Sequence, residues 1–163
     1  LVIVQPGLVY GPGDPSAIGA AFRQYLEGKL PMLPVGAEYC WAHVDDIAHA
    51  HVLAMEEGRS GEAYIIAGPR HSLIEAMELA ERLTGVKAPR LRGSPGLLRL
   101  LSNVMGLVER VVPVPEDLSS EYLRVSAGVT YLGSNAKARQ GLGYEPRSLE
   151  VGLAETLDFE RKR

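Results

Sequence analysis

Two short apolar runs, each as long as one strand, constrain the fold of this chain more than any other feature. Residues 1–5 (LVIVQ) are almost wholly apolar and β-branched, and residues 62–66 (EAYII) form a second run. Such continuous runs are typical of strands that are buried on both faces, as in a parallel sheet. Helical patterns separate the two runs, so residues 1–68 are predicted to form part of a layered α/β domain.

Capping residues mark where the helices between these runs begin and end. Ser16 can accept hydrogen bonds from the first turn of a helix over residues 17–27. Asp45 or Asp46 is the predicted N-cap of a second helix, which ends at Gly58. A short strand precedes this second helix, and the segment between the first helix and that strand is predicted to be a loop.

The sequence changes character after residue 68. A capping box, S-x-x-E at residues 72–75, precedes an amphipathic helix, and helical patterns then predominate. One predicted helix, residues 97–108, is apolar on most of its sides. The chain is therefore predicted to have two parts: residues 1–68, with an inserted segment at about 29–44, and a mostly helical lobe at residues 69–163.

Composition excludes several classes of function. With 17 Lys and Arg against 20 Asp and Glu, the net charge is −3, which does not suit a partner with a phosphate backbone, so nucleic acid is not expected. The single cysteine, Cys40, excludes an intrachain disulfide and fits a reducing, cytoplasmic location. The longest apolar-rich stretch, residues 97–112, contains Arg99, Glu109 and Arg110, so no membrane span is expected.

The densest group of polar side chains is the segment H-V-D-D-I-A-H-A-H at residues 43–51. Asp45 and His49 are four residues apart on one helix face, which would suit a metal ion. His49 and His51 lie about 200° apart around a helix and cannot share one ion. The favoured interpretation is an aspartate cap with histidines on the surface, and no metal site is predicted.

Two further patterns are weak. Tyr25 and Lys29 match Y-x-x-x-K, in which the lysine lowers the pKa of the tyrosine so that it acts as an acid or base. Here the lysine follows the predicted end of the helix, so no catalytic residue is assigned. Gly7, Gly11 and Gly13 lack the G-x-G-x-x-G spacing of a dinucleotide-binding loop.

Four segments, taken together and in order, resemble motifs of the extended short-chain dehydrogenase/reductase family, the NAD(P)-dependent epimerases, dehydratases and reductases. They span the whole chain: V-Q-P-G-L-V-Y-G-P-G-D at 4–14, A-H-V-D-D-I-A-H-A-H at 42–51, G-R-S-G-E-A-Y-I-I-A-G at 58–68, and S-N-A-K-A-R-Q-G-L-G-Y-E-P at 134–146. The resemblance implies an α/β fold: the C-terminal part of a Rossmann-type doubly wound sheet plus a mostly helical substrate-binding lobe.

The resemblance also implies a division of roles along the chain. The family's dinucleotide loop, its catalytic Ser/Thr and its Y-x-x-x-K motif precede the Q-P-G segment, so we expect a fragment of a longer enzyme that uses NAD or NADP. We expect the fragment alone to bind neither cofactor usefully, because it lacks the helix N-terminus that holds the phosphates. By analogy, the backbone of Pro6, Gly7, Leu8 and Val9 lines the nicotinamide end of the cofactor site. The residues expected to face the substrate are Tyr10, Met32, Leu33, Tyr39, Trp41 and Leu101.

One departure from the family pattern bears on the substrate. Sugar-nucleotide members carry an Arg-Asp pair just before the H-V-D-D helix, where the arginine binds a diphosphate. Here residues 38–42 read E-Y-C-W-A, with no cation. Trp41 offers a large apolar face instead, so Trp41 and the 97–108 helix are expected to form opposite walls of an apolar pocket.

The favoured function is therefore oxidation or reduction of an apolar carbonyl or hydroxyl compound, as in the dihydroflavonol-reductase-like branch. The expected partner is a small-molecule substrate, and the full-length protein is expected to form a homodimer. Two alternatives remain open: sugar-nucleotide epimerisation or dehydration, and a non-catalytic cofactor-binding or interaction module.

Overall fold

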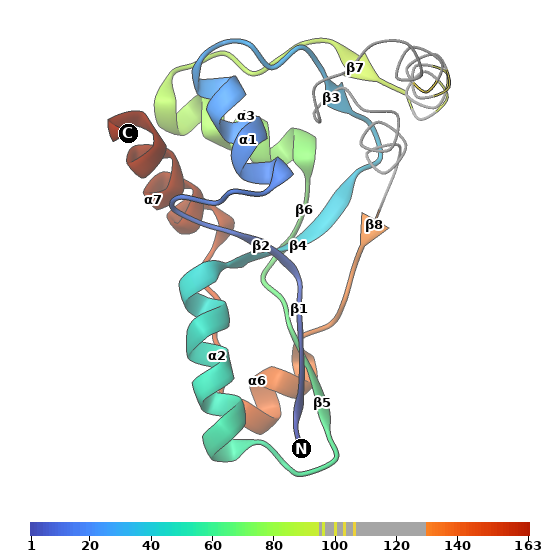
Figure 1. Ribbon diagram of the computed structural model, residues 1–163, viewed down its shortest axis with the longest axis vertical. Helices are drawn as coiled ribbons and strands as arrows, with labels where there is room; N and C mark the ends of the chain where they lie inside the picture. The colour runs from blue at the N-terminus through green and yellow to red at the C-terminus, as the bar shows by residue number, and fades with distance from the viewer. Residues whose placement is uncertain (95, 97–99, 101–102, 104–105, 107–129) are drawn as a thin grey trace.

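The computed structural model describes residues 1–94 and 130–163, together with residues 96, 100, 103 and 106. Of the predicted apolar helix at residues 97–108, only residues 100, 103 and 106 are described. The fold is mixed α/β, as expected, and segments far apart in the sequence pack together: residues 17–26 against 149–162, and residues 44–57 against 136–142 (Figure 1).

A pair of parallel strands forms the part of the molecule that is lowest in Figure 1. Strand β1 (Ile3–Pro6) pairs with β5 (Ala63–Ile66) in the register Ile3 to Ala63. Helices α2 (Val44–Glu57) and α6 (Ala136–Leu142) pack against this pair. Within β1, Val4 is half-buried and packs toward the interior, whereas its neighbours Ile3 and Gln5 are exposed, as expected from strand alternation.

A second sheet continues both strands upward. Its order is β2, β4, β6: β4 runs parallel to β2 and antiparallel to β6, and the short strand β8 also pairs with β4. The bounds are Leu8–Tyr10 for β2, Glu38–His43 for β4, Arg70–Ser72 for β6 and Thr130–Tyr131 for β8. A separate two-residue pairing joins β3 (Leu33–Pro34) to β7 (Arg92–Gly93). Strand β3 lies within the segment that was predicted to be a loop.

Three helices cover the upper sheet, and their caps follow the sequence signals. In α1 (Ala17–Leu26), Ser16 accepts a hydrogen bond from the Ile18 amide, as predicted. The predicted capping box of Ser72 and Glu75 begins α3 (Leu73–Thr84). Ser148 caps α7 (Leu149–Lys162) through the Val151 amide. These short-range signals were reliable because each cap is complete within four residues.

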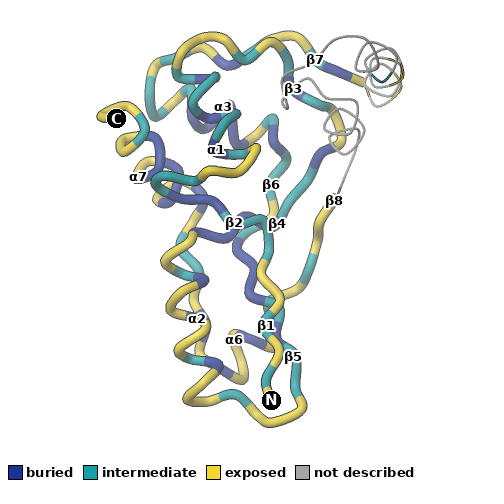
Figure 2. Tube along the Cα trace, in the orientation of Figure 1, coloured by how far each residue is buried: buried dark blue, intermediate teal, exposed yellow. Residues whose placement is uncertain are grey.

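The interior consists of two clusters of buried side chains (Figure 2). The Trp41 cluster lies under α1, α3 and α7, and includes Tyr10, Phe22, Tyr25, Trp41, Met77, Leu153 and Leu157. The Tyr64 cluster lies between α2, α6 and the β1–β5 pair, and includes Ala42, Ile47, Ala50, Ala54, Tyr64, Ile66, Ala138, Leu142 and Tyr144. Both clusters draw residues from each side of residue 68, so the division of the chain there stays a prediction.

Candidate functional site

The carboxyl ends of β1 and β5 are the natural place for a ligand. The two strands lie side by side as far as Pro6 and Ile66, and β4 then enters between their continuations, β2 and β6. This entry requires glycine: a Cβ on Gly7 would overlap the Cys40 carbonyl oxygen, and one on Gly68 would overlap the Trp41 carbonyl oxygen. Ligands of open α/β sheets bind outside the carboxyl ends of strands, where neighbouring strands part.

The four residues expected to line the cofactor span this point. Pro6 ends β1 and is exposed, and Gly7 is half-buried between the two strands. The half-buried side chains of Leu8 and Val9 pack against the Trp41 cluster and the Tyr64 cluster, respectively. These side chains are committed to the interior, which leaves the backbone for contact with a ligand. Their role toward a cofactor stays a prediction.

A segment distant in sequence covers the same carboxyl ends. The Tyr131 hydroxyl donates to the Pro6 carbonyl oxygen at 3.2 Å, and the Asn135 amide nitrogen donates to the Ala67 carbonyl oxygen at 2.7 Å. Between them, a Cβ on Gly133 would press on the Ile65 side chain. We call residues 130–135 the strap. Sequence analysis missed its contacts, because no local signal links residues that are more than sixty positions from their partners.

The structure contradicts the expected role of Trp41. Its side chain is 1% exposed, and its indole nitrogen donates to the His71 carbonyl oxygen at 3.0 Å. Tyr10 packs edge-on against it, with ring centroids 5.5 Å apart, and Phe22 lies on it with centroids 6.2 Å apart. Trp41 lies on the central strand β4, and its ring is buried in the cluster under α1, α3 and α7. The predicted pocket wall is therefore wrong for Trp41.

The other residues expected to face the substrate divide into two groups. Tyr10 and Leu33 are buried in the Trp41 cluster, whereas Tyr39 and Met32 are half-buried. Leu101 lies outside the described residues. Of the five described positions, only Tyr39 and Met32 present part of their surface outside the core.

Tyr25 and Lys29 do not form a catalytic pair. The Tyr25 hydroxyl donates to the Val86 carbonyl oxygen at 2.6 Å and lies 2.8 Å from the Thr84 hydroxyl. The Lys29 ammonium pairs instead with Glu27 at 2.7 Å. Burial raises the pKa of Tyr25, which opposes its use as a base. The match to Y-x-x-x-K is a coincidence of sequence, as the sequence analysis favoured.

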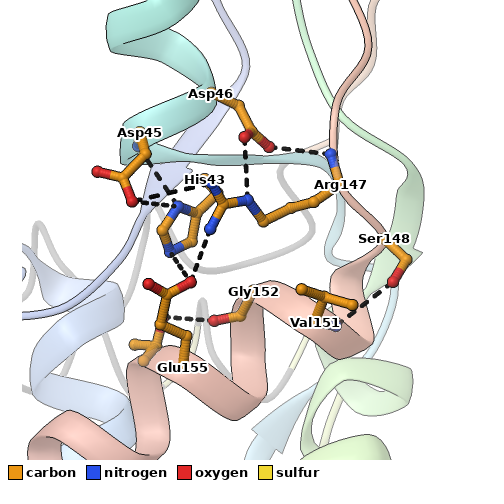
Figure 3. A network of polar contacts seen from close by, with 9 residues as sticks. His43, Asp45, Asp46, Arg147, Ser148, Val151, Gly152 and Glu155 are labelled. Carbon is orange, nitrogen blue, oxygen red and sulfur yellow. Dashed lines mark hydrogen bonds and ion pairs between the residues drawn. The ribbon is translucent and has the colours of Figure 1, made fainter.

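A network of charged groups joins the two halves of the chain (Figure 3). Arg147, which precedes α7, donates from its backbone nitrogen and from Nε to the two carboxylate oxygens of Asp46, at 3.0 and 2.9 Å. Its Nη1 donates to Glu155 of α7 at 2.6 Å. One guanidinium therefore ties the first turn of α2 to α7. We call His43, Asp45, Asp46, Arg147 and Glu155 the Arg147 network.

The predicted aspartate cap of α2 is wrong. The helix begins at Val44, directly after β4, and His43 is its N-cap: the imidazole Nδ1 accepts from the Asp45 amide at 3.4 Å. No loop residue separates strand from helix, so the last extended residue takes the capping position. Asp45 and Asp46 lie in the first turn, where negative charge is still favourable, and the Asp46 carboxylate binds Arg147 instead.

His43 is buried and uncharged at neutral pH. Burial, reinforced by the positive charge of Arg147, lowers the pKa of His43 despite three nearby carboxylates. Its Nε2 has no hydrogen-bond partner among the described residues and lies 3.8 Å from a Glu155 carboxylate oxygen. The adjacent Tyr10 ring packs edge-on, with centroids 5.4 Å apart, and burial raises the pKa of Tyr10 far above its usual range. The Tyr10 hydroxyl is therefore unsuited to giving up its proton at neutral pH.

The same network contains a group with the spacing of a metal site. His43, Asp45 and Glu155 each offer one ligand atom within 4.8 Å of the others. The Arg147 guanidinium, however, already binds Glu155 and lies 3.8 Å from Asp45, so a divalent cation would have to displace a fixed positive charge. The pair Asp45–His49 does not occur in this group, and His49 is exposed. The arrangement is a network of ion pairs that connects α2 with α7.

A surface cavity of about 590 Å³ lies elsewhere, beside α1 and the end of α7. The Glu160 carboxylate in its wall accepts from the Gly13 amide at 3.1 Å and lies 3.7 Å from Arg23. None of the residues expected to bind cofactor or substrate lines this cavity. Its lining consists of Gly13, Pro15, Arg23, Leu26, Glu27, Glu160 and Arg163.

Among the helices of the described part, none has the length and apolar character needed to cross a membrane.

Two curated proteins are similar to this chain in sequence. Sterol demethylase protein B of Methylococcus capsulatus is 26% identical over 168 residues, which cover 100% of this chain and 50% of that protein. The 2-alkyl-3-oxoalkanoate reductase of Stenotrophomonas maltophilia is also 26% identical, over 93% of this chain and 49% of that protein. The chain thus spans about half the length of these curated relatives.

Solved structures share the fold over nearly the whole chain. The crystal structure of gox2253 superposes with a TM-score of 0.78 at 28% identity, covering 99% of this chain and 49% of that one. The structure of PA4631, a nucleoside-diphosphate-sugar epimerase from Pseudomonas aeruginosa, gives 0.77 at 24% identity, covering 99% and 48%.

The sequence profile of the NAD dependent epimerase/dehydratase family matches residues 1–67, which include β1, β5 and the parting of the strands. The four motifs, this match, the relatives and the Rossmann-type architecture of the solved structures agree. The chain resembles the NAD dependent epimerase/dehydratase family, one of the extended short-chain dehydrogenases/reductases, and residues 1–67 carry the family match.

Proposed function

We propose that this chain is the substrate-holding part of an NAD(P)-dependent oxidoreductase that acts on an apolar carbonyl or hydroxyl compound. The observation that carries the proposal is the chemistry beside the parted strands. The side chains there are aromatic or apolar: Tyr39 on β4, and Tyr131 and Leu132 in the strap, which are 51% and 47% exposed. Arg70, which faces Cys40 across β4 and β6, is already paired with Glu38.

The names of the two relatives support this substrate class. One is called a sterol demethylase protein, and the other a 2-alkyl-3-oxoalkanoate reductase. Sterols and alkyl oxoalkanoates are largely apolar compounds with one oxygenated reacting centre. A site for such a molecule needs apolar walls and few charges.

The described residues fit a nicotinamide at the carboxyl end of β1. The side chains of Leu8 and Val9 pack against the two buried clusters, so this stretch offers backbone to a flat ring. The cofactor supplies or accepts the hydride. This chain would hold the ring and exclude water. It would not supply the proton, because its buried tyrosines, Tyr10 and Tyr25, have raised pKa values and are unsuited to proton transfer. The catalytic acid would come from outside these residues.

Two lesser parts of the proposal rest on the same chain. Residues 1–68 would contribute to the cofactor domain, and residues 69–163 would form most of the substrate lobe. Cys40 is free and buried, which supports a reducing, cytoplasmic location.

The experiment is a substrate panel on the full-length protein that contains this chain. NADH and NADPH oxidation are followed with a 2-alkyl-3-oxoalkanoate and a 3-ketosteroid, and UDP-glucose is incubated with NAD for epimerisation. Turnover of an apolar carbonyl compound, without conversion of UDP-glucose, is the expected result.

One observation favours a second candidate, because PA4631 is named a nucleoside-diphosphate-sugar epimerase and its structure superposes well. Conversion of UDP-glucose, with no turnover of the apolar compounds, would replace the proposal with sugar-nucleotide epimerisation. Cofactor binding without turnover of any compound would favour a non-catalytic module.

A further inference from the structure

We propose that the surface cavity beside α1 and the end of α7 is a binding site for a small zwitterion, an α-amino acid with an apolar side chain. The volume of the cavity, about 590 Å³, lies within the range of small-molecule sites. Its lining shares no residue with those expected to bind cofactor or substrate. The inference therefore goes beyond the proposed function and does not depend on it.

One carboxylate in the wall of this cavity is buried and incompletely bonded. The Glu160 side chain is 1% exposed. Its Oε1 accepts from the Gly13 amide at 3.1 Å, whereas its Oε2 has no hydrogen-bond partner among the described residues. A buried carboxylate oxygen without a donor is costly, and such oxygens are rare in folded proteins. Oε2 therefore needs a donor from outside the described residues, and an ammonium group supplies both the donor and the opposite charge.

The guanidinium beside Glu160 does not satisfy this oxygen. Arg23 Nη1 lies 3.7 Å from Oε2, beyond hydrogen-bond distance, and donates instead to the Asp14 carbonyl oxygen at 2.9 Å. The Arg23 side chain is 33% exposed, and its Nε and Nη2 have no acceptor among the described residues. Since arginine presents several donors in one plane, those that remain can bind a carboxylate.

The charges of the wall favour a ligand that carries both signs. A simple anion would face the buried Glu160 carboxylate, and a simple amine would face Arg23 and the exposed Arg163, which lines the same cavity. The fourth charged group, Glu27, is already paired with Lys29 at 2.7 Å. An α-amino acid has its ammonium and carboxylate on one carbon, so the ammonium can donate to Glu160 while the carboxylate accepts from the neighbouring Arg23.

The rest of the wall suits an apolar side chain on this ligand. Pro15 is exposed and Leu26 is half-buried, and both line the cavity. Gly13 adds no side chain, and the Phe159 ring lies 3.6 Å from the place that a Cβ on Gly13 would occupy. Contact of an aliphatic ligand with such surface is favourable, because apolar area leaves water. Leucine is therefore the probe of choice.

The test uses the full-length protein that contains this chain and three compounds that differ by one group each. L-leucine has both charged groups, 4-methylpentanoate lacks the ammonium, and 3-methylbutylamine lacks the carboxylate. Isothermal titration calorimetry measures the three dissociation constants. L-leucine is expected to bind with a Kd below about 1 mM. The other two compounds should bind at least about tenfold more weakly, since each loses charge-assisted hydrogen bonds.

Two matched variants locate the site. Glu160→Gln keeps an oxygen that can accept from the Gly13 amide, and removes the negative charge. It should weaken binding of L-leucine about tenfold or more, and it should not weaken binding of 4-methylpentanoate, which has no ammonium to lose. Asp158→Asn is the control, because Asp158 is an exposed carboxylate of the same helix that pairs with Lys162 and does not line the cavity. It should leave all three constants at their wild-type values.

Three outcomes would overturn the inference. They are no binding of L-leucine to the folded wild type, equal affinities for L-leucine and 4-methylpentanoate, and equal binding of L-leucine to Glu160→Gln and Asp158→Asn. If Glu160→Gln does not fold, Arg23→Lys decides instead, because it keeps the charge and removes the planar donors. It should weaken binding of L-leucine and leave that of 3-methylbutylamine unchanged, and an equal effect on both compounds would contradict the site.

Discussion

The two buried clusters solve the same packing problem in different ways. The Trp41 cluster is built around four large aromatic side chains, and three helices and a sheet enclose it. The Tyr64 cluster is smaller, and four of its nine buried residues are alanines, with α2 and α6 close against one face of the β1–β5 pair. On the other face of that pair, Ile3 is 48% exposed and Gln5 is exposed as well.

This difference shows where the fold is self-sufficient. Large aromatic rings bury much apolar area per residue, so the upper half can be held by its own core. Alanines let helices approach closely but bury little area each, and parallel strands are normally covered on both faces. The lower half therefore depends more on its attachments, which are the glycine crossing at Gly7 and Gly68 and the Arg147 network.

Removing the central aromatic residue should have the largest effect. Trp41→Ala is expected to lower the free energy of unfolding by about 4 kcal/mol, because the ring is fully buried between Tyr10 and Phe22. Urea unfolding, followed by circular dichroism, measures it. Met55→Ala is the control: Met55 is 86% exposed on α2, and its loss should be near zero. A small effect for Trp41→Ala would mean that the upper core is not what holds the fold.

The crossing between the halves should be nearly as sensitive. Gly68→Ala places a methyl group on the Trp41 carbonyl oxygen, a backbone atom that cannot turn away, and should cost on the order of 3 kcal/mol. Gly28→Ala is the matched control. Gly28 has φ = 68° and no neighbouring atom within 4 Å of its added Cβ, so only the backbone strain of about 1 kcal/mol applies. Equal losses in the free energy of unfolding for the two variants would show that the close approach of Gly68 to β4 does not constrain the fold.

The Arg147 network should contribute a smaller, coupled amount. Arg147→Met is expected to cost about 2 kcal/mol, because it removes the guanidinium charge and the Nε donor from the Asp46 carboxylate, 12% exposed, and leaves only the backbone amide of residue 147 as a donor. Adding Asp46→Asn should recover part of the loss, which a double-mutant cycle measures directly. The exposed pair Lys162–Asp158 offers a comparison, and its coupling should not exceed about 0.5 kcal/mol. If the losses in the free energy of unfolding at Arg147 and Asp46 are additive, the two residues are not coupled and the prediction is wrong.

The sequence predicted the parts of this fold that are local. The caps at Ser16 and Ser72 were correct because each depends on a few successive residues. The two strands were located correctly because their apolar runs are short and uninterrupted, although β1 is exposed on one face and not buried on both. The family was recognisable because its four motifs keep their order along the chain.

The sequence failed where the outcome depends on distant partners. Trp41 was expected in a pocket, since its type and motif position do not reveal that β2 and β6 flank it on both sides. Asp46 was expected as a cap, since its partner Arg147 lies 101 residues away. Tyr131 was missed for the same reason. Each error follows from tertiary contacts that outweigh local preference.

The smallest effect should appear in the pH dependence of stability, and it tests the boundary between the two halves at His43. Burial and Arg147 lower the pKa of His43 below its usual 6.5, against the opposing pull of Asp45, Glu155 and Asp46. As the pH falls below about 6.5, the unfolded chain takes up a proton at this residue before the folded protein does. The free energy of unfolding should therefore be highest above pH 6.5 and decrease as the pH falls toward the lowered pKa.

Comparing unfolding curves of the wild type and His43→Gln across this range isolates the effect. The variant cannot gain the proton, so its stability should depend less steeply on pH between 6.5 and the acidic limit where the carboxylates begin to titrate. The exposed His49 and His51 remain in both proteins and cancel in the comparison. Identical slopes of the free energy of unfolding against pH would mean that His43 reaches solvent or gains a compensating partner. Water would then enter between the Tyr64 cluster and the Trp41 cluster at β4.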